Sequence, residues 1–267
     1  MISPPSSVVL EINGFSVHYY GIIMFFAIIA ALFLIRYVAK KYYKDVDTNV
    51  LLDVLPAVIL FSLIGARLYY VLMDFSYYAK YPSEIIAVWN GGMSIHGAIL
   101  GGIISGLVFS KIHHFSFLKY ADVFPYGLAI GQAIGRFGNY FNCEAFGKPC
   151  DIPYLKLYIP MQHRPFGYEQ YSYFHPAFLY ESLWDICVFL LLFFVIRKFV
   201  QKYKLKDGTV FFSYLLLYSF GRIFVEWCRI DSVKSFWGIP VAQIASITII
   251  AVSLIFLALL NKRKGKI

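Results

Sequence analysis

The sequence has few charged residues for its length. Only 15% of its 267 residues are Asp, Glu, Lys or Arg, whereas 60% are hydrophobic. A water-soluble domain of this size cannot shield so large an apolar fraction from solvent. The composition therefore excludes an ordinary soluble protein and predicts an integral membrane protein. The many aromatic residues, 26 Phe and 22 Tyr, fit a chain that lines two membrane interfaces.

Several motifs of familiar chemistry are missing. The chain has no GxSxG, Walker, GxGxxG or HExxH pattern, so nothing indicates a serine hydrolase, a nucleotide-binding site or a zinc peptidase. Its four cysteines form no CxxC pair, which argues against a thiolate zinc site. We expect no metal and no cofactor. Cys143 and Cys150 share one segment and can pair only if it lies outside the cell; free thiols are the favoured interpretation.

Seven apolar runs have about the length, roughly 20 residues, that a membrane-spanning helix needs. They lie at 17–36, 51–73, 93–110, 121–139, 177–197, 209–227 and 239–260. We therefore predict an all-α integral membrane protein with seven transmembrane helices in a single domain, 1–267. A segment rich in Pro, Tyr and Gly, residues 140–176, forms an insertion between helices four and five.

The loops predict the orientation of these helices. Fifteen of the 24 Lys and Arg residues fall in loops on one side, six fall on the other, and Arg67, Arg136 and Arg222 lie inside runs. Because basic loops stay in the cytoplasm, the N-terminus and the 140–176 insertion are expected outside and the C-terminus inside. The net charge of +9 could suggest a nucleic-acid partner. Because most of the basic residues lie in loops on one side, membrane orientation explains them, and no nucleic acid is expected.

The stretch Gly135–Gly147 carries polar side chains at the end of an apolar run. Arg136 and Asn139 lie three residues apart and share a helix face, with Glu144 just beyond. The guanidinium fork matches phosphate oxygens, so a phosphate site is one interpretation. The alternative is an internal Arg136–Glu144 pair that joins two helices.

A second polar stretch predicts an arginine in the same leaflet. Arg222 and Glu226 are one helical turn apart and can pair with each other. Two arginines at one depth repel unless an anion lies between them, and a phospholipid head group is the obvious membrane anion. Glu181, one turn inside the fifth run, needs an arginine partner. A self-neutralised Arg222–Glu226 pair remains the alternative.

His96 starts the third run on the outer side and can titrate near neutral pH, so it is a candidate general base. A histidine that only hydrogen-bonds at a helix start is the plainer alternative. Tyr20 and Tyr218 lie at the same depth, but their spacing alone does not distinguish them from packing residues.

The pattern Gly-Arg-x-Gly-Asn-aromatic-x-Asn-x-Glu-x-x-Gly at 135–147 resembles the signature of the prolipoprotein diacylglyceryl transferases, with Tyr140 where Phe is usual. The resemblance covers nearly the whole chain. It includes Tyr20-Gly21, His96-Gly97, His175-Pro176, Leu179-Tyr180-Glu181, 218–226 and Gln243. The departures are Ala98 in place of a second Gly and Ala177-Phe178 in place of a more polar pair. They affect packing or lipid contacts more than the reaction.

This resemblance implies a transferase of the bacterial plasma (inner) membrane. Its substrates would be phosphatidylglycerol and preprolipoprotein signal peptides with a lipobox cysteine. The thiol would attack the diacylglyceryl carbon, form a thioether and release glycerol 1-phosphate. The implied catalytic residues are His96, Arg136, Arg222 and Glu226. The implied head-group contacts are Arg136, Asn139, Glu144, Gly147, Arg222, Tyr20 and Tyr218, with Glu144 and Glu226 orienting the arginines.

A transporter or channel for a small anion would also need buried arginines and glycine-rich helices. Such folds usually show inverted repeats and broken helices at matched positions, which this sequence lacks. The transferase is therefore favoured, and a monomer in contact with membrane lipid is expected.

Overall fold

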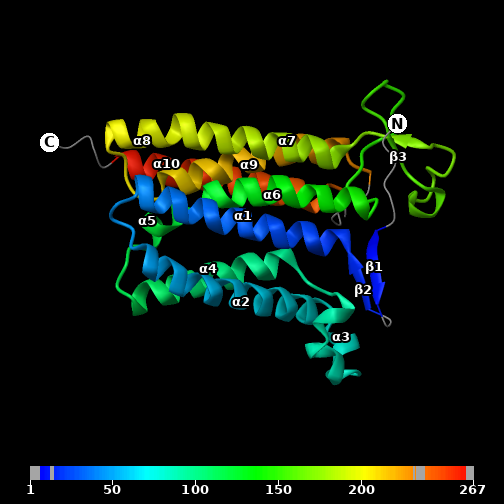
Figure 1. The fold of residues 1–267 in the computed structure, drawn as a ribbon, viewed down its shortest axis with the longest axis horizontal. Coiled ribbons are helices and arrows are strands. Elements are labelled where there is room, and N and C mark those ends of the chain that lie inside the picture. Colours follow the sequence, from blue (N-terminus) through cyan, green and yellow to red (C-terminus); the bar gives the residue numbers. More distant parts are fainter. Residues whose placement is uncertain (1–6, 13–14, 231, 233–237, 263–267) are drawn as a thin grey trace. The chain divides into compact units, whose positions relative to one another are not determined.

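The computed structural model describes residues 7–12, 15–230, 232 and 238–262. The chain forms two compact units, one made of residues 1–38 and 121–267 and the other of residues 39–120. Figure 1 labels the elements along the chain.

The first unit is mainly a helical bundle. Its helices are α1 (Tyr19–Tyr42, whose last four residues belong to the second unit), α6 (Phe124–Phe141), α7 (Ala177–Leu190), the π-helical η4 (Leu191–Ile196), α8 (Arg197–Tyr203), α9 (Thr209–Cys228) and α10 (Val241–Lys262). The unit also contains two small antiparallel hairpins, β1–β2 (Val8–Ile12 and Phe15–His18) and β3–β4 (Leu157–Tyr158 and Tyr173–Phe174). A 3₁₀ turn, η3 (Met161–His163), lies between β3 and β4.

The second unit packs α2 (Thr48–Met73) against α4 (Ile95–Ile112), with α3 (Phe75–Tyr78), η1 (Pro82–Ile86), η2 (Val88–Asn90) and α5 (Phe117–Ala121) in its connections. Glycines make this packing tight. A Cβ added at Gly65 or at Gly97 would overlap the carbonyl oxygen of the other residue. The two helix backbones therefore touch, as small residues allow between membrane helices.

Each of the seven predicted runs is largely helical, although residues 17 and 18 of the first run belong to β2. Five described helices, α1, α2, α4, α9 and α10, are long and apolar enough to cross a membrane. An all-α membrane protein is thus confirmed in its coarse form, although two small β hairpins were not predicted. Two predicted ends were wrong: the first helix continues past 36 to Tyr42, and the helical run that starts at 177 continues through η4 to Tyr203 instead of ending at 197.

Glycines also bring α1 and α6 together. A Cβ added at Gly127 would lie 2.6 Å from the Ala31 carbonyl oxygen, and one at Gly138 would lie 2.6 Å from the Tyr20 ring. Larger residues at these positions would push the helices apart. Tyr19 stacks on Phe141 at the end of the same contact, with ring centroids 4.3 Å apart.

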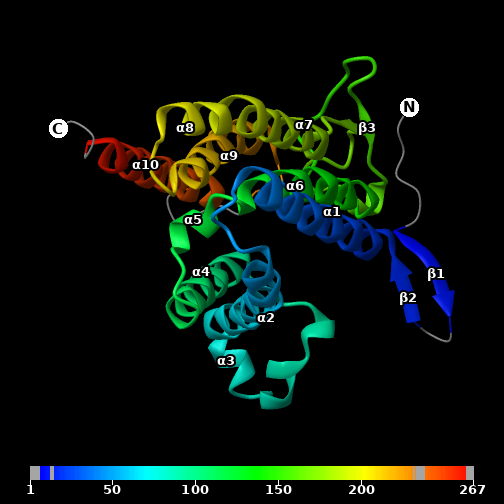
Figure 2. The same ribbon diagram turned by 60° about the vertical axis from the view of Figure 1, so that its left-hand side comes forward.

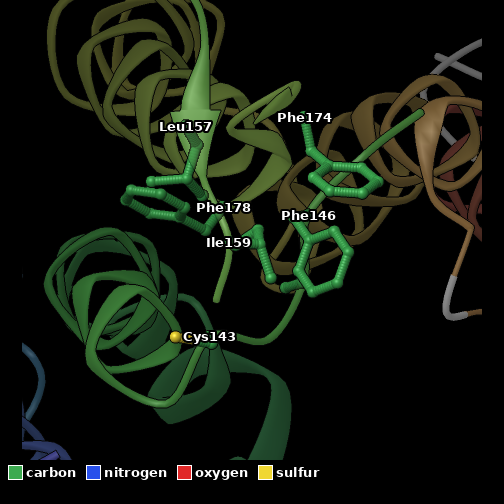
Figure 3. Close-up of a cluster of buried hydrophobic side chains, with 7 residues drawn as sticks. Cys143, Phe146, Leu157, Ile159, Phe174 and Phe178 are labelled. Carbon is green, nitrogen blue, oxygen red and sulfur yellow. The ribbon is translucent and has the colours of Figure 1, made fainter. Parts of the chain in front are cut away.

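The 140–176 segment has its own small core. Its buried members are Cys143, Ala145, Phe146, Leu157, Ile159 and Phe174, and they pack with Phe178 at the start of α7. Figure 3 shows the rings of Phe146 and Phe174 beside Ile159. Cys143 and Cys150 are both free thiols, as favoured, and burial raises the pKa of the Cys143 thiol. The segment is thus folded onto α7.

Candidate functional site

Three helices, α6, α7 and α9, form the scaffold of the site and lie side by side (Figures 1 and 2). The Ser182 hydroxyl donates to the Ala133 carbonyl at 2.8 Å and ties α7 to α6. The Trp184 indole donates to the Leu217 carbonyl at 3.0 Å and ties α7 to α9. Gly221 permits this second contact, because a Cβ there would overlap the Trp184 indole nitrogen. Both hydrogen bonds start from residues that closely follow Glu181 on α7, and they hold this part of the helix against α6 and α9.

The centre of the site is a chain of ion pairs around Glu181. One carboxylate oxygen of Glu181 lies 2.5 Å from Arg136 Nη2, and the other lies 2.9 Å from Arg222 Nη1. Arg222 Nη2 also lies 2.8 Å from Glu226 Oε2, one turn along α9. The predicted Arg222–Glu226 pair therefore forms, and Glu181 has the arginine partner that it was expected to need. We call Arg136, Glu181, Arg222 and Glu226 the arginine–glutamate network.

The network corrects one detail of the sequence analysis. The anion between the two arginines is the protein's own Glu181. The acidic and basic members of the network also differ in burial. The side chains of Glu181 and Glu226 are only 2% and 3% exposed, whereas those of Arg136 and Arg222 keep 22% and 16% of their surface. The arginine side chains are thus the more accessible members of the network, and the two carboxylates are almost completely covered.

Two further groups of α7 and α9 adjoin the network. Tyr218 lies close enough to Arg136 to interact with it electrostatically, which brings this predicted residue into the site. Asp185, one turn beyond Glu181, also interacts with both arginines and was missed by the sequence analysis. The sequence held a signal for it, because an acidic residue inside an apolar helix usually has a function.

Asn139 and Glu144 form a separate cluster at the end of α6. The side-chain amide of Asn142 donates to Glu144 at 2.9 Å, and that of Asn139 is 3.5 Å from the other carboxylate oxygen. No ion pair joins Glu144 to Arg136 within the described part of the chain, and the carboxylate that pairs with this arginine is Glu181. Glu181 has that place because α7 packs directly on α6.

Gly147 and Tyr20 lie at the borders of this region. The Gly147 amide donates to the His175 carbonyl at 2.8 Å, and Gly147 forms a β-bridge with Arg229. A Cβ at Gly147 would lie 2.9 Å from the His175 Cβ, so this glycine allows the insertion to pack against the ends of α7 and α9. Tyr20, at the second position of α1, covers Gly138.

His96 belongs to the second unit. It is exposed at the second position of α4, with its ring centroid 5.9 Å from that of Tyr69. Arg67, the third arginine within a predicted run, has a different environment from the other two. Its guanidinium donates to backbone carbonyls, among them Ile85 at 2.9 Å and Gly92 at 2.9 Å, and so holds the loop that follows α3.

An apolar groove of about 450 Å³ lies beside the network. It is lined by Ile23 and Phe26 of α1, by Ile130, Ala133, Ile134 and Phe137 of α6, and by Ser182 and Ile186 of α7. Several of its residues are sequence neighbours of Arg136 and Glu181. A ligand with a phosphate at the network therefore has an apolar surface next to it.

Comparison with known proteins gives one consistent result. The family model described as prolipoprotein diacylglyceryl transferase matches residues 7–259. A relative from Nostoc sp. is 42% identical over 99% of this chain and 92% of its own length, and one from Synechococcus elongatus is 41% identical over 92% and 84%. A third, from Fervidobacterium nodosum, is 38% identical over 97% and 86%. All three are called phosphatidylglycerol–prolipoprotein diacylglyceryl transferase.

Removing the shared carboxylate should destabilise the first unit. We expect Glu181→Gln to lower the free energy of unfolding by about 3 kcal/mol, because two partly buried arginines lose the buried counter-ion that they share. The measurement is the thermal unfolding of the purified protein in detergent. Glu144→Gln serves as the control, since Glu144 is exposed, and should change stability by no more than about 0.5 kcal/mol. Equal losses in both variants would contradict a central role for Glu181.

Proposed function

Because this chain belongs to the prolipoprotein diacylglyceryl transferase family, we propose that its arginine–glutamate network binds the phosphate of phosphatidylglycerol. The protein transfers the diacylglyceryl group of that lipid to the lipobox cysteine of a preprolipoprotein. The observation that carries the proposed site is the difference in burial within the network, in which only the arginine side chains keep appreciable exposure.

The chemistry explains why cations are needed at this place. The cysteine sulfur forms a bond to the glyceryl carbon, and the bond from that carbon to the phosphate oxygen breaks. The bonding electrons pass to the phosphate, so its negative charge increases in the transition state. Fixed donors near that oxygen favour the transition state over the bound lipid. Arg136 and Arg222 supply them, and the buried Glu181 and Glu226 hold both guanidiniums in position.

Other predicted residues take supporting roles in this proposal. Tyr218 adjoins Arg136 and borders the phosphate. Asn139, Glu144, Gly147 and Tyr20 are proposed to contact the glycerol of the head group; the packing of Tyr20 on Gly138 keeps it beside α6. The thiol loses its proton before or during attack, because the thiolate is the nucleophile. His96 remains the predicted base for that proton.

The apolar groove beside the network is proposed to hold an acyl chain of the lipid. An acyl chain is attached within a few bonds of the phosphate, so it needs an apolar surface close to the arginines. The groove is lined by side chains of α1, α6 and α7 and offers that surface. A small-anion transporter, the competing function, would have no use for it.

The membrane arrangement is proposed as the sequence predicts it. All seven runs cross the membrane, with α6 and the α7–α8 run added to the five helices that meet the length and composition of a span. The N-terminus and the 140–176 insertion face the outside, and the C-terminus faces the cytoplasm, in a monomeric protein of the bacterial plasma membrane. The uneven distribution of Lys and Arg supports this orientation.

Loss of either arginine should remove transfer. The assay follows glycerol phosphate release and the mass of a lipobox peptide together, with phosphatidylglycerol in detergent. We expect Arg136→Ala and Arg222→Lys to lower kcat/KM by about 10²-fold or more, because lysine lacks the planar fork. If each of the two variants keeps its activity, the phosphate must bind at another place in the protein.

Arg197→Lys provides the matched control for that assay. Arg197 is also buried and basic, but it lies about 24 Å farther along the helical run that carries Glu181. It should keep transfer near the level of the unchanged protein. His96→Gln in the same assay tests the base: a kcat close to that of the unchanged protein at every pH would remove His96 from the proton transfer.

A larger side chain in the groove should weaken the binding of long-chain lipids more than that of short-chain lipids. We expect Ile134→Phe to raise KM for long-chain phosphatidylglycerol about tenfold and to leave a dioctanoyl lipid nearly unaffected, since overpacking costs on the order of 1–3 kcal/mol. The measurement is the ratio of the two KM values. Leu183→Phe, at an exposed position of α7 outside the groove, should not change that ratio. An equal effect of both variants would exclude the groove as the acyl site.

Surface labelling tests the orientation. Phe166 is 98% exposed in the insertion, and Asp207 is exposed in the loop between α8 and α9. A membrane-impermeant maleimide applied to intact cells should label Phe166→Cys above the background of the native cysteines and should not label Asp207→Cys. The reverse pattern would invert the proposed topology.

A further inference from the structure

Asp185 is a buried acid beside the network that, among the described residues, has no hydrogen bond or ion pair through its carboxylate. The residue is 1% exposed, and both carboxylate oxygens lack a hydrogen-bond partner among the described residues. Within the same residues it forms no ion pair, unlike Glu181 and Glu226. Burying an ionised carboxylate without partners is expensive, so such a group in an apolar helix needs an explanation.

The surroundings of Asp185 point to the network. Glu181 is one turn away on the same helix, and the arginines of α6 and α9 lie close enough to interact with it through space. Tyr214 and Tyr218 of α9 also interact electrostatically with Asp185. The ionisable groups that face Asp185 are thus Glu181 of α7, Arg136 of α6, and Tyr214, Tyr218 and Arg222 of α9.

Charge balance then gives Asp185 a specific effect. Arg136 and Arg222 are offset by Glu181 and Glu226, so the network alone is neutral. A protonated Asp185 leaves it neutral, whereas an ionised Asp185 gives it an excess negative charge. The lipid phosphodiester brings one negative charge of its own. In a water-poor site two such anions compete strongly for the same two cations.

We propose that Asp185 is a positioning residue that gates phosphate binding through the charge of its own carboxyl group. This inference rests on the proposed phosphate site. When Asp185 carries its proton, both guanidiniums are available to the lipid. When it is ionised, it acts as an internal anion that attracts them and repels the phosphate. Binding of the lipid is therefore coupled to proton uptake by Asp185, and the proton returns to solvent when the phosphate leaves.

The experiment measures lipid binding and turnover across a pH series. Binding of dioctanoyl phosphatidylglycerol to the full-length protein in detergent is followed by calorimetry, with phosphatidylcholine as the zwitterionic reference, and KM and kcat are measured in the transfer assay. In the unchanged protein, Kd and KM should rise by up to about tenfold per pH unit once Asp185 ionises. In Asp185→Asn, which cannot ionise, both should stay flat over the same range while kcat is retained.

Two further variants separate gating from a general structural effect. Asp185→Glu keeps an ionisable group and should restore the rise of KM with pH. Asp207→Asn removes an exposed acid and should leave the profile of the unchanged protein. The proposal is overturned if Asp185→Asn keeps the pH dependence of the unchanged protein. It is also overturned if this variant melts normally but binds no lipid at any pH, because the ionised carboxylate would then be required.

The same data distinguish a failure of the proposed phosphate site. If Arg136→Ala binds phosphatidylglycerol as well as the unchanged protein does, the phosphate site is wrong whatever Asp185 does. If Arg136→Ala loses binding and Asp185→Asn remains pH-dependent, the phosphate site stands and only the gating role falls.

Discussion

The site depends on one buried carboxylate that two arginines share. Glu181 is nearly inaccessible, and each of its oxygens lies within hydrogen-bonding distance of a guanidinium from a different helix. An isolated charge at this depth would be costly, and a pair of arginines would repel each other. Because the three charges occur together, they favour the close packing of α6, α7 and α9, in which both arginine side chains stay partly exposed.

Hydrogen bonds other than the ion pairs support that arrangement. The Ser182–Ala133 and Trp184–Leu217 hydrogen bonds fix α7 between its neighbours, and Gly221 makes room for the indole ring. At the opposite end of the bundle, the Asp122 carboxylate accepts from the amides of Gly208 and Phe211, at 2.8 Å each, and so caps the start of α9. The ion pairs therefore form between helices whose positions are already set, which lowers the cost of ordering long side chains.

Arg67 shows that an arginine inside an apolar run can use its hydrogen bonds to hold the backbone of a loop. Backbone carbonyls of a single loop surround its guanidinium, so its hydrogen bonds are used to order the chain. Arg136 and Arg222 instead pair with carboxylates and keep part of their surface exposed. The residue type is the same in all three places, and the partner decides whether the charge is available to a ligand.

The sequence by itself determined the membrane class, the positions of seven helical runs and the family, because hydropathy and the Gly135–Gly147 pattern are local properties of the chain. It also indicated the Arg222–Glu226 pair, since residues four apart on a helix are neighbours. Only the tertiary structure decided that Glu181 joins both arginines, that Glu144 contacts asparagines instead, and that Asp185 is buried beside them. These contacts join residues from separate helices, and their pairing depends on how α6, α7 and α9 pack, which no local pattern encodes.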